Sequence, residues 1–266
     1  MKRAALGTAL LFWATACATH VPVQPLAPDD PRPRLLLEDW IESARERRAL
    51  RGRARLAVDR EDGAIHLRGK QLVLLERPSS LRVEILGFLN QSHAVLVTDG
   101  EHFEVYRARD RSFESGEVDD RLLWNEAGIS LSPEEAVAVL LGAPTFDQTL
   151  SPSGAVLDGE GRIRIDLADA EGAVRQRITF DPTGPLHGFE LLDTSGEMVW
   201  RAQFREYRDV GGISFAHAIS LDVAAGKTHA EISLRDVELN PELSPELFRL
   251  RLPDAWNPPV TNQLPR

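Results

Sequence analysis

The feature that most restricts the fold is a two-residue alternation of apolar and polar side chains, which recurs through the chain after Gly52. Side chains of a strand point to opposite faces in turn, so this period is typical of strands that bury one face. Shorter runs lie at 81–85, 163–167 and 198–204. The longest run consists of Ile213, Phe215, His217, Ile219, Leu221 and Val223, and the residues that alternate with them are small or polar.

Turn signals separate these runs. They are the pairs D-G at 99–100 and 158–159, E-G at 171–172, S-G at 195–196 and G-G at 211–212, and the stretch D-P-T-G at 181–184. Such sequences favour tight connections between strands. The pattern predicts a mainly β (α+β) fold: about ten strands in up-and-down order, forming one antiparallel sheet that curls into an incomplete barrel.

Two segments have helical spacing instead. Residues 35–50 carry charges on one side and apolar residues on the other: Leu37, Trp40, Ile41 and Ala44. The stretch S-P-E-E at 132–135 is a capping box with proline at the first helical position, and Gly142 and Pro144 stop the helix that follows. A curled sheet with open ends needs a cover over its apolar interior. The two helices are therefore predicted to form a lid.

The N-terminus has the pattern of an exported chain. Residues 1–16 combine a basic start with a short apolar run, as a secretory signal peptide does, and this run is too short to span a bilayer. The stretch A-T-A-C at 14–17 resembles the lipobox of bacterial lipoproteins, in which the cysteine is acylated. Cys17 is the only cysteine and cannot form an internal disulfide. Lipidation of Cys17 is the prediction; a non-lipidated signal peptide with a leftover cysteine is the alternative.

The residues after Cys17 predict how the chain is placed. Residues 17–34 contain five prolines, which favours an extended tether that holds the folded domain off the membrane. By resemblance to lipoproteins of enteric bacteria, Ala18 indicates the outer membrane of a Gram-negative cell, with the domain facing the periplasm. The domain itself is expected over 35–253, followed by a flexible tail at 254–266.

Charge and motifs exclude several function classes. The net charge of −10 argues against binding to a nucleic-acid backbone. Metal-ligand spacing, a G-x-S-x-G elbow and the glycine patterns of nucleotide sites do not occur in the sequence. No catalytic residue, cofactor or metal is therefore predicted, and an active site assembled from distant strands is the alternative. His217 is interpreted as a satisfied core or cavity residue rather than a ligand or base.

Three stretches resemble the LolA and LolB group of bacterial lipoprotein-sorting proteins. Residues 81–97, with L-G at 86–87, resemble the strand, Pro-Leu-Gly connection and strand of LolB. Residues 127–144, from A-G-I-S-L to L-L-G-A-P, resemble its segment before and through the helix. The C-terminal part resembles LolA-type proteins and LolB-like lipoproteins, from F-R-E-Y at 204–207 through N-P-E-L at 240–243 to L-F at 247–248 and L-P at 252–253.

This resemblance implies an incomplete β-barrel with a helical lid and an apolar cavity for acyl chains. It implies acylated lipoproteins or lipids as cargo and a periplasmic LolA-like carrier as a partner. In LolB an exposed leucine of the connection is implicated in membrane transfer, and Leu86 matches its position. Here Ile85 replaces the proline, and residues 88–92 are an insertion.

The site prediction has two parts. Leu86, Phe88 and Leu89 form either an apolar tip that contacts membrane or cargo, or core residues of a continuing strand with a bulge at Gly87. The predicted lipid cavity is lined by residues from the most consistently apolar faces: Leu81, Val83, Ile85, Trp200, Phe204, Phe215 and Ile219. Two functions follow as hypotheses. One is non-covalent lipid or lipoprotein transfer, and the other is a structural adaptor in an envelope complex whose barrel is filled by its own side chains.

Overall fold

The structure, a computed structural model, describes residues 23–63 and 66–250. The predicted signal peptide at 1–16, the lipidation site Cys17 and the tail at 254–266 lie outside the described residues. Among the described residues, no helix is both long and apolar enough to cross a membrane.

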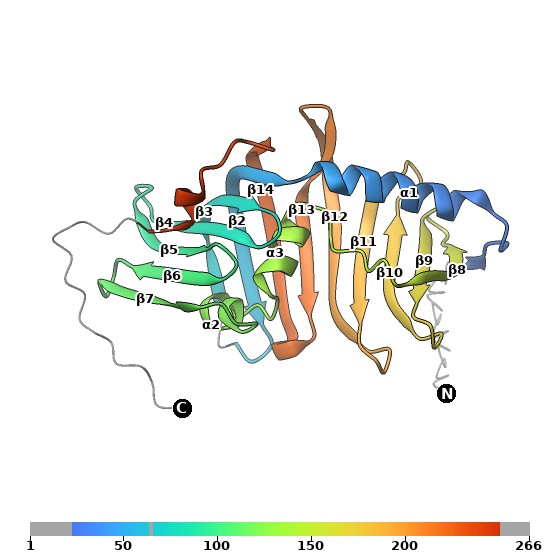
Figure 1. The fold of residues 1–266 in the computed structure, drawn as a ribbon, viewed down its shortest axis with the longest axis horizontal. Helices are drawn as coiled ribbons and strands as arrows, with labels where there is room; N and C mark the ends of the chain where they lie inside the picture. The colour runs from blue at the N-terminus through green and yellow to red at the C-terminus, as the bar shows by residue number, and fades with distance from the viewer. Residues whose placement is uncertain (1–22, 64–65, 251–266) are drawn as a thin grey trace, which may run out of the picture.

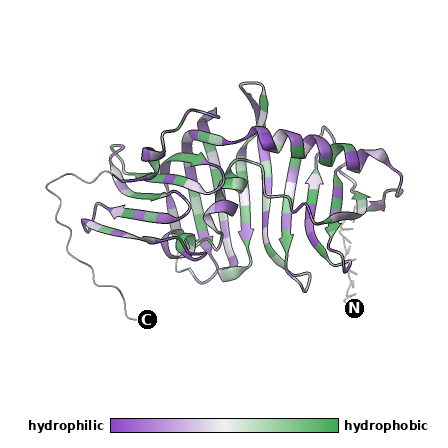
Figure 2. Ribbon diagram, viewed as in Figure 1, coloured by the Kyte–Doolittle hydropathy of each residue, from purple (hydrophilic) through white to green (hydrophobic). Residues whose placement is uncertain are grey.

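One open antiparallel sheet of 14 strands forms the body of the described chain (Figure 1). Figure 2 shows hydrophobic and hydrophilic residues alternating along its strands, as the sequence predicts. The strands are β1 (Gln24–Pro25), β2 (Ala49–Arg60), β3 (His66–Glu76), β4 (Ser80–Leu86), β5 (Ser92–Thr98), β6 (His102–Arg107), β7 (Ser112–Glu117), β8 (Ser151–Leu157), β9 (Ile163–Ala168), β10 (Val174–Phe180), β11 (Leu186–Leu192), β12 (Met198–Val210), β13 (Ile213–Val223) and β14 (Thr228–Leu239).

The strand order is that of two meanders joined side by side. Strands β2 to β7 follow one another in the sheet, as do β8 to β14, and β14 pairs with β2 from Thr228↔Arg60 to Leu239↔Leu50. The short β1 pairs with β8 at one edge, and β7 is the other edge. The prediction of an open antiparallel sheet is confirmed. The predicted count of about ten strands is wrong, and so is the simple up-and-down order, because β14 returns to pair with β2.

Three α-helices accompany the sheet: α1 (Pro31–Glu46), α2 (Leu122–Ala127) and α3 (Pro133–Leu140). Two 3₁₀ turns, η1 (Ala225–Lys227) and η2 (Pro245–Phe248), lie near the end of the described chain. In Figure 1, α1 crosses the half of the sheet that contains β8 to β12. Its buried Trp40 packs against Phe180 of β10 and Phe189 of β11 at ring distances of 6.4 and 6.2 Å. Helix α3 lies nearer the centre and contacts β4.

The predicted N-terminal helix is shifted. It starts at Pro31 rather than residue 35, because the Asp30 side chain caps it by accepting from the Arg32 N–H at 3.0 Å. It ends at Glu46, and residues 49 and 50 already belong to β2. Within the predicted tether over 17–34, residues 24 and 25 form β1 and residues 31–34 are the first residues of α1. Helix α1 has 16 residues and is the longest of the three described α-helices.

The predicted capping box of α3 is confirmed. The Ser132 side chain accepts from the Glu135 N–H at 3.2 Å, and the Glu135 carboxylate accepts from the Ser132 N–H at 2.9 Å. The turn signals are confirmed as well, because glycines with positive φ lie in each connection: Gly100, Gly161, Gly172, Gly184, Gly196, Gly211 and Gly212. Glycine adopts this backbone region without the steric cost of a side chain.

Candidate functional site

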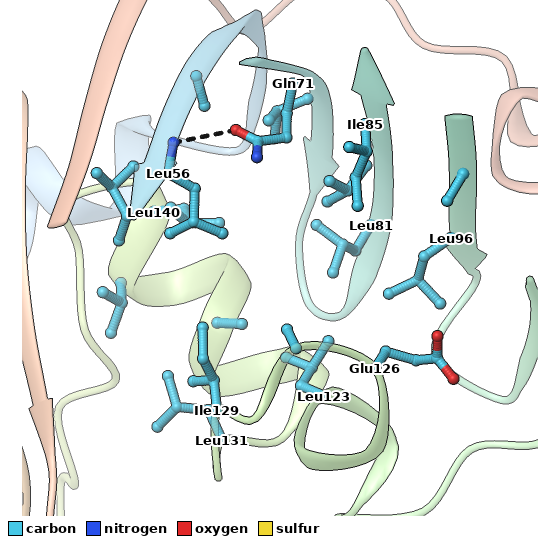
Figure 3. Close-up of a pocket in the computed structure, with 18 of the residues that line it drawn as sticks. Leu56, Gln71, Leu81, Ile85, Leu96, Leu123, Glu126, Ile129, Leu131 and Leu140 are labelled. Atoms are coloured by element: carbon cyan, nitrogen blue, oxygen red, sulfur yellow. Dashed lines mark hydrogen bonds between the residues drawn. The ribbon is translucent and has the colours of Figure 1, made fainter. Parts of the chain in front are cut away.

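An apolar cavity of about 150 Å³, partly open to solvent, lies between the curled β2–β6 part of the sheet and the two short helices (Figure 3). Strand β4 contributes Leu81, Val83 and Ile85. On the other side, Leu123 comes from α2, Ile129 and Leu131 from the segment after it, and Ala136, Val139 and Leu140 from α3. Leu221 of β13 and Ile232 of β14 complete the wall where the two meanders meet.

The alternation of the strands places these side chains. Ile85, Val83 and Leu81 pair across β4 and β5 with Ala94, Leu96 and Thr98, so that every second residue of both strands faces inward. Helix α3 presents its apolar residues to this face, and its capping box fixes where the helix begins. A space with an apolar wall of this size holds a benzene-sized ligand or part of a hydrocarbon chain.

Two polar side chains lie in the wall of the cavity. Gln71 of β3 is 1% exposed, and its Oε1 accepts from the Leu56 N–H at 3.1 Å. Glu126 of α2 accepts two hydrogen bonds from Arg107 Nη2, at 2.6 and 2.7 Å. In Figure 3, Gln71 and Glu126 lie at opposite sides of the cavity.

Hydrogen bonds fasten the covering helices to the sheet. The Trp200 indole N–H donates to Glu135 Oε1 at 3.0 Å, which links β12 to α3. The Thr228 hydroxyl donates to the Gly128 carbonyl at 3.0 Å and so links η1 and β14 to the end of α2. Buried Arg47 donates to the Gly142 carbonyl at 2.6 Å and to the Ser214 carbonyl at 3.2 Å, and burial lowers the pKa of its guanidinium.

The connection between β4 and β5 is an exposed apolar tip. Phe88 is 96% exposed and Leu89 is 80% exposed. The turn is closed by the Gly87 N–H, which donates to the Gln91 carbonyl at 2.8 Å, and by the Asn90 N–H, which donates to the Gly87 carbonyl at 3.0 Å. Leu86 is half-buried at the end of β4. The interpretation of Phe88 and Leu89 as core residues is therefore wrong.

The predicted cavity residues lie in three different places. Leu81, Val83 and Ile85 line the cavity together. Trp200 lines a different cavity of about 150 Å³ beside Glu135 and Gln176. Phe204, Phe215 and Ile219 are fully buried in the packed core, where they lie among other large apolar side chains.

Sequence reasoning missed the residues of α2 and of the segment after it, and it missed Gln71. The sequence does contain a signal for Gln71, because this polar residue lies in line with the inward apolar residues Val73 and Leu75 of β3. His217 is a buried residue whose Nδ1 lies 3.1 Å from the Phe215 carbonyl oxygen, in agreement with its interpretation as a satisfied core side chain. Over residues 23–63 and 66–250, no three His, Cys, Asp or Glu side chains come together in a group that could hold a metal ion.

Comparison with known proteins identifies the fold. No protein-family model matches the sequence, and no curated protein matches it. Among solved structures, a LolA superfamily protein from Nitrosomonas europaea has a TM-score of 0.50 at 12% identity, covering 80% of this chain and 97% of that chain. A DUF1329 family protein from Desulfovibrio piger has a TM-score of 0.54 at 12% identity, covering 81% and 95%. The fold is therefore LolA-like, while the closer resemblance to LolB stays a prediction.

Proposed function

We propose that this chain is an outer-membrane lipoprotein that binds acyl chains of lipoproteins or lipids and takes part in their localisation to that membrane. The observation that carries the proposal is the apolar cavity under α2 and α3. Burying hydrocarbon there contributes about 0.8 kcal/mol per CH₂ group, so binding needs no chemistry on the cargo. The similarity to the LolA superfamily fold supports the same reading.

The arrangement of the β4–β5 hairpin also supports it. Strand β4 lines the cavity with Leu81, Val83 and Ile85, β5 lines it with Ala94 and Leu96, and the connection between them carries Phe88 and Leu89 at its exposed end. An exposed apolar tip of this kind marks a contact with a membrane or an apolar partner. In the proposal, Phe88 and Leu89 touch the bilayer or the cargo, a LolA-like carrier delivers that cargo, and acylated Cys17 holds the domain at the periplasmic face.

The adaptor hypothesis predicts an interior filled by the chain's own side chains. That description fits the half of the sheet around Phe204, Phe215 and Ile219, all of which have no exposed surface. The half under α3 differs because it leaves the cavity open. The cavity favours lipid binding over a purely structural role.

The test compares two tryptophan substitutions on neighbouring residues of β5. Ala94 lines the cavity, whereas His93 is exposed on the other side of the strand. Ala94→Trp is expected to fill the cavity and to abolish binding of a fluorescent fatty-acyl probe, with its circular dichroism unchanged. His93→Trp is expected to bind the probe like the wild type. Equal binding by both variants, or no binding by the wild type, contradicts the proposal.

The anchor has its own test. Cys17→Ser is expected to lose incorporation of labelled palmitate and to move from the outer-membrane fraction to the soluble periplasmic fraction. Palmitate labelling that persists in Cys17→Ser contradicts the lipidation part of the proposal and leaves the cavity part intact.

A further inference from the structure

One amide in the cavity wall has a donor group without a protein partner. Gln71 is 1% exposed, and its Nε2 has no hydrogen-bond partner among the residues that the structure describes. Its orientation is determined by its neighbour, because the Leu56 N–H can only donate and therefore requires the amide oxygen. The NH₂ group consequently points away from Leu56, along the cavity wall (Figure 3).

A buried donor without an acceptor destabilises the folded protein relative to an apolar side chain of the same shape. The neighbouring inward positions of β3 are Val73 and Leu75, so an apolar residue fits the pattern of this strand. The Leu56 N–H explains the need for an oxygen at position 71. It does not explain the NH₂ group, which the acceptor of a ligand in the cavity would satisfy.

Space for such an acceptor is left by Gly69. This residue lies two positions before Gln71 on the same face of β3 and has no side chain. A Cβ atom at position 69 would lie 3.7 Å from Gln71 Nε2 and 3.9 Å from Ile85 Cγ2. Both values are ordinary contact distances, so the missing side chain at position 69 leaves open space in front of Gln71 Nε2 and Ile85 into which a ligand can extend.

The charges of the wall restrict the chemistry of the acceptor. Glu126 is the only ionisable residue of the lining, and the lining contains no cationic side chain. A carboxylate head group would therefore be buried without a counter-charge, which is unfavourable. An amide would bring an N–H that needs its own acceptor. The carbonyl oxygen of an ester needs only one donor.

We infer that Gln71 Nε2 donates a hydrogen bond to the carbonyl oxygen of an acyl ester whose hydrocarbon chain lies in the cavity. The inference rests on the proposed lipid-binding function and narrows its ligand to esterified acyl chains, as opposed to free fatty acids. Gln71 is a specificity residue in this scheme: the apolar wall supplies affinity, and the amide selects the carbonyl.

The test uses the full-length chain and two probes that differ only in the carbonyl oxygen, methyl octanoate and 1-methoxyoctane. Each probe displaces a fluorescent apolar dye from the cavity. The wild type is expected to prefer the ester by roughly fivefold, the ratio that one neutral hydrogen bond provides. In Gln71→Met this preference is expected to disappear, while the ether binds as before. Octanoate at neutral pH is expected to bind more weakly than the methyl ester.

Comparing two probes within one variant cancels any general loss of stability, because both probes bind the same folded protein. If Gln71→Met does not fold, Gly69→Val provides the second test. It leaves Gln71 and its bond to Leu56 in place, fills the space beside the amide, and is expected to lose the ester preference as well.

Each outcome separates the inference from the proposed function. Equal binding of ester and ether by the wild type, a preference that persists in a folded variant, or tighter binding of octanoate overturns the ester assignment but leaves lipid binding intact. Failure of every probe to displace the dye overturns the proposed function and the inference together.

Discussion

Removing the apolar tip is expected to abolish direct membrane contact without affecting the fold. The change is the double substitution Phe88→Ser and Leu89→Ser, in a chain that starts after Cys17 so that no lipid anchor contributes. Full burial of a Phe or Leu side chain contributes about 1.5–3 kcal/mol. Phe88 is 96% exposed and Leu89 is 80% exposed, so nearly all of this free energy is available on transfer to a bilayer. Together they contribute about 3–5 kcal/mol, which corresponds to roughly a 10²- to 4 × 10³-fold change in partitioning.

The same exposure predicts that stability does not change. The turn is closed by backbone groups of Gly87, Asn90 and Gln91, and the Leu89 N–H donates to Gln91 Oε1 at 2.9 Å. None of these bonds involves the side chains at 88 and 89. The free energy of unfolding of the double variant is therefore expected to stay within about 0.5 kcal/mol of the wild type, as for other surface substitutions.

The assay is co-flotation with uncharged phosphatidylcholine vesicles, which excludes electrostatic attraction as the cause of binding. Leu35→Ser is the matched control, because Leu35 is a 46% exposed apolar residue on α1, away from the tip. The control is expected to float like the wild type, and the double variant is expected to remain in the soluble fraction. The reasoning is refuted if the double variant floats with the vesicles, or if the Leu35 control loses binding to the same extent.

Three further predictions concern the residues that hold the cavity cover and the sheet. Glu135→Ala removes half of the capping box and leaves the buried Trp200 N–H without its acceptor. Its free energy of unfolding, measured in urea, is therefore expected to fall by about 2–3 kcal/mol. The control Glu134→Ala, at the exposed neighbouring residue, is expected to change it little. A hydrogen bond to Asp222 raises the pKa of His229. This pair therefore stabilises the fold fully below about pH 6.5, the pKa of an unperturbed histidine, and less as the pH rises through the raised pKa. Over that pH range the melting temperature of the wild type is expected to fall, and that of His229→Gln is expected to stay constant. Gly226→Ala places a Cβ atom 2.5 Å from Trp124 at a φ of +70°, whereas Gly172→Ala places one in open space at a φ of +85°. Gly172→Ala is therefore expected to show only the backbone strain of about 1–3 kcal/mol, and Gly226→Ala is expected to destabilise the protein by more than this in thermal unfolding.

The alternation of apolar and polar residues is sufficient to predict which side of each strand is buried. Every second residue of β9, at Ile163, Ile165 and Leu167, is buried, and the same holds for Trp200, Ala202 and Phe204 of β12. The start of α3 was also readable, because its cap is built from adjacent residues, Ser132 to Glu135. These features depend only on neighbours in the chain, which a sequence displays directly.

The sequence pattern does not predict the structure correctly where two local signals compete or where the contacting residues are far apart in the chain. The proline-rich stretch before residue 35 indicates an extended tether, but Asp30 followed by Pro31 is also a helix start, and packing of Trp40 against Phe180 and Phe189 favours the helix. The pairing of β14 with β2 joins Leu239 to Leu50, and a period of two identifies faces but not neighbouring strands. The strand order therefore could not be deduced from alternation.

The place of the cavity within the sheet follows from the sizes of the inward side chains rather than from their polarity. Around the packed half these positions hold Phe180, Phe189, Phe204 and Phe215, all without exposed surface. The lining of the cavity contains no phenylalanine, and its strand positions hold aliphatic residues such as Leu81, Val83 and Leu96 together with Ala54 and Ala94. The alternation of apolar and polar residues is the same in both halves, so the sequence pattern predicts the aromatic residues Phe204 and Phe215 for the cavity although they lie in the packed half. A close-packed interior leaves space where its side chains are smaller. The change from phenylalanine to aliphatic residues and alanine along the inward positions is therefore the signal that separates the half with the apolar cavity from the half that is filled by its own side chains.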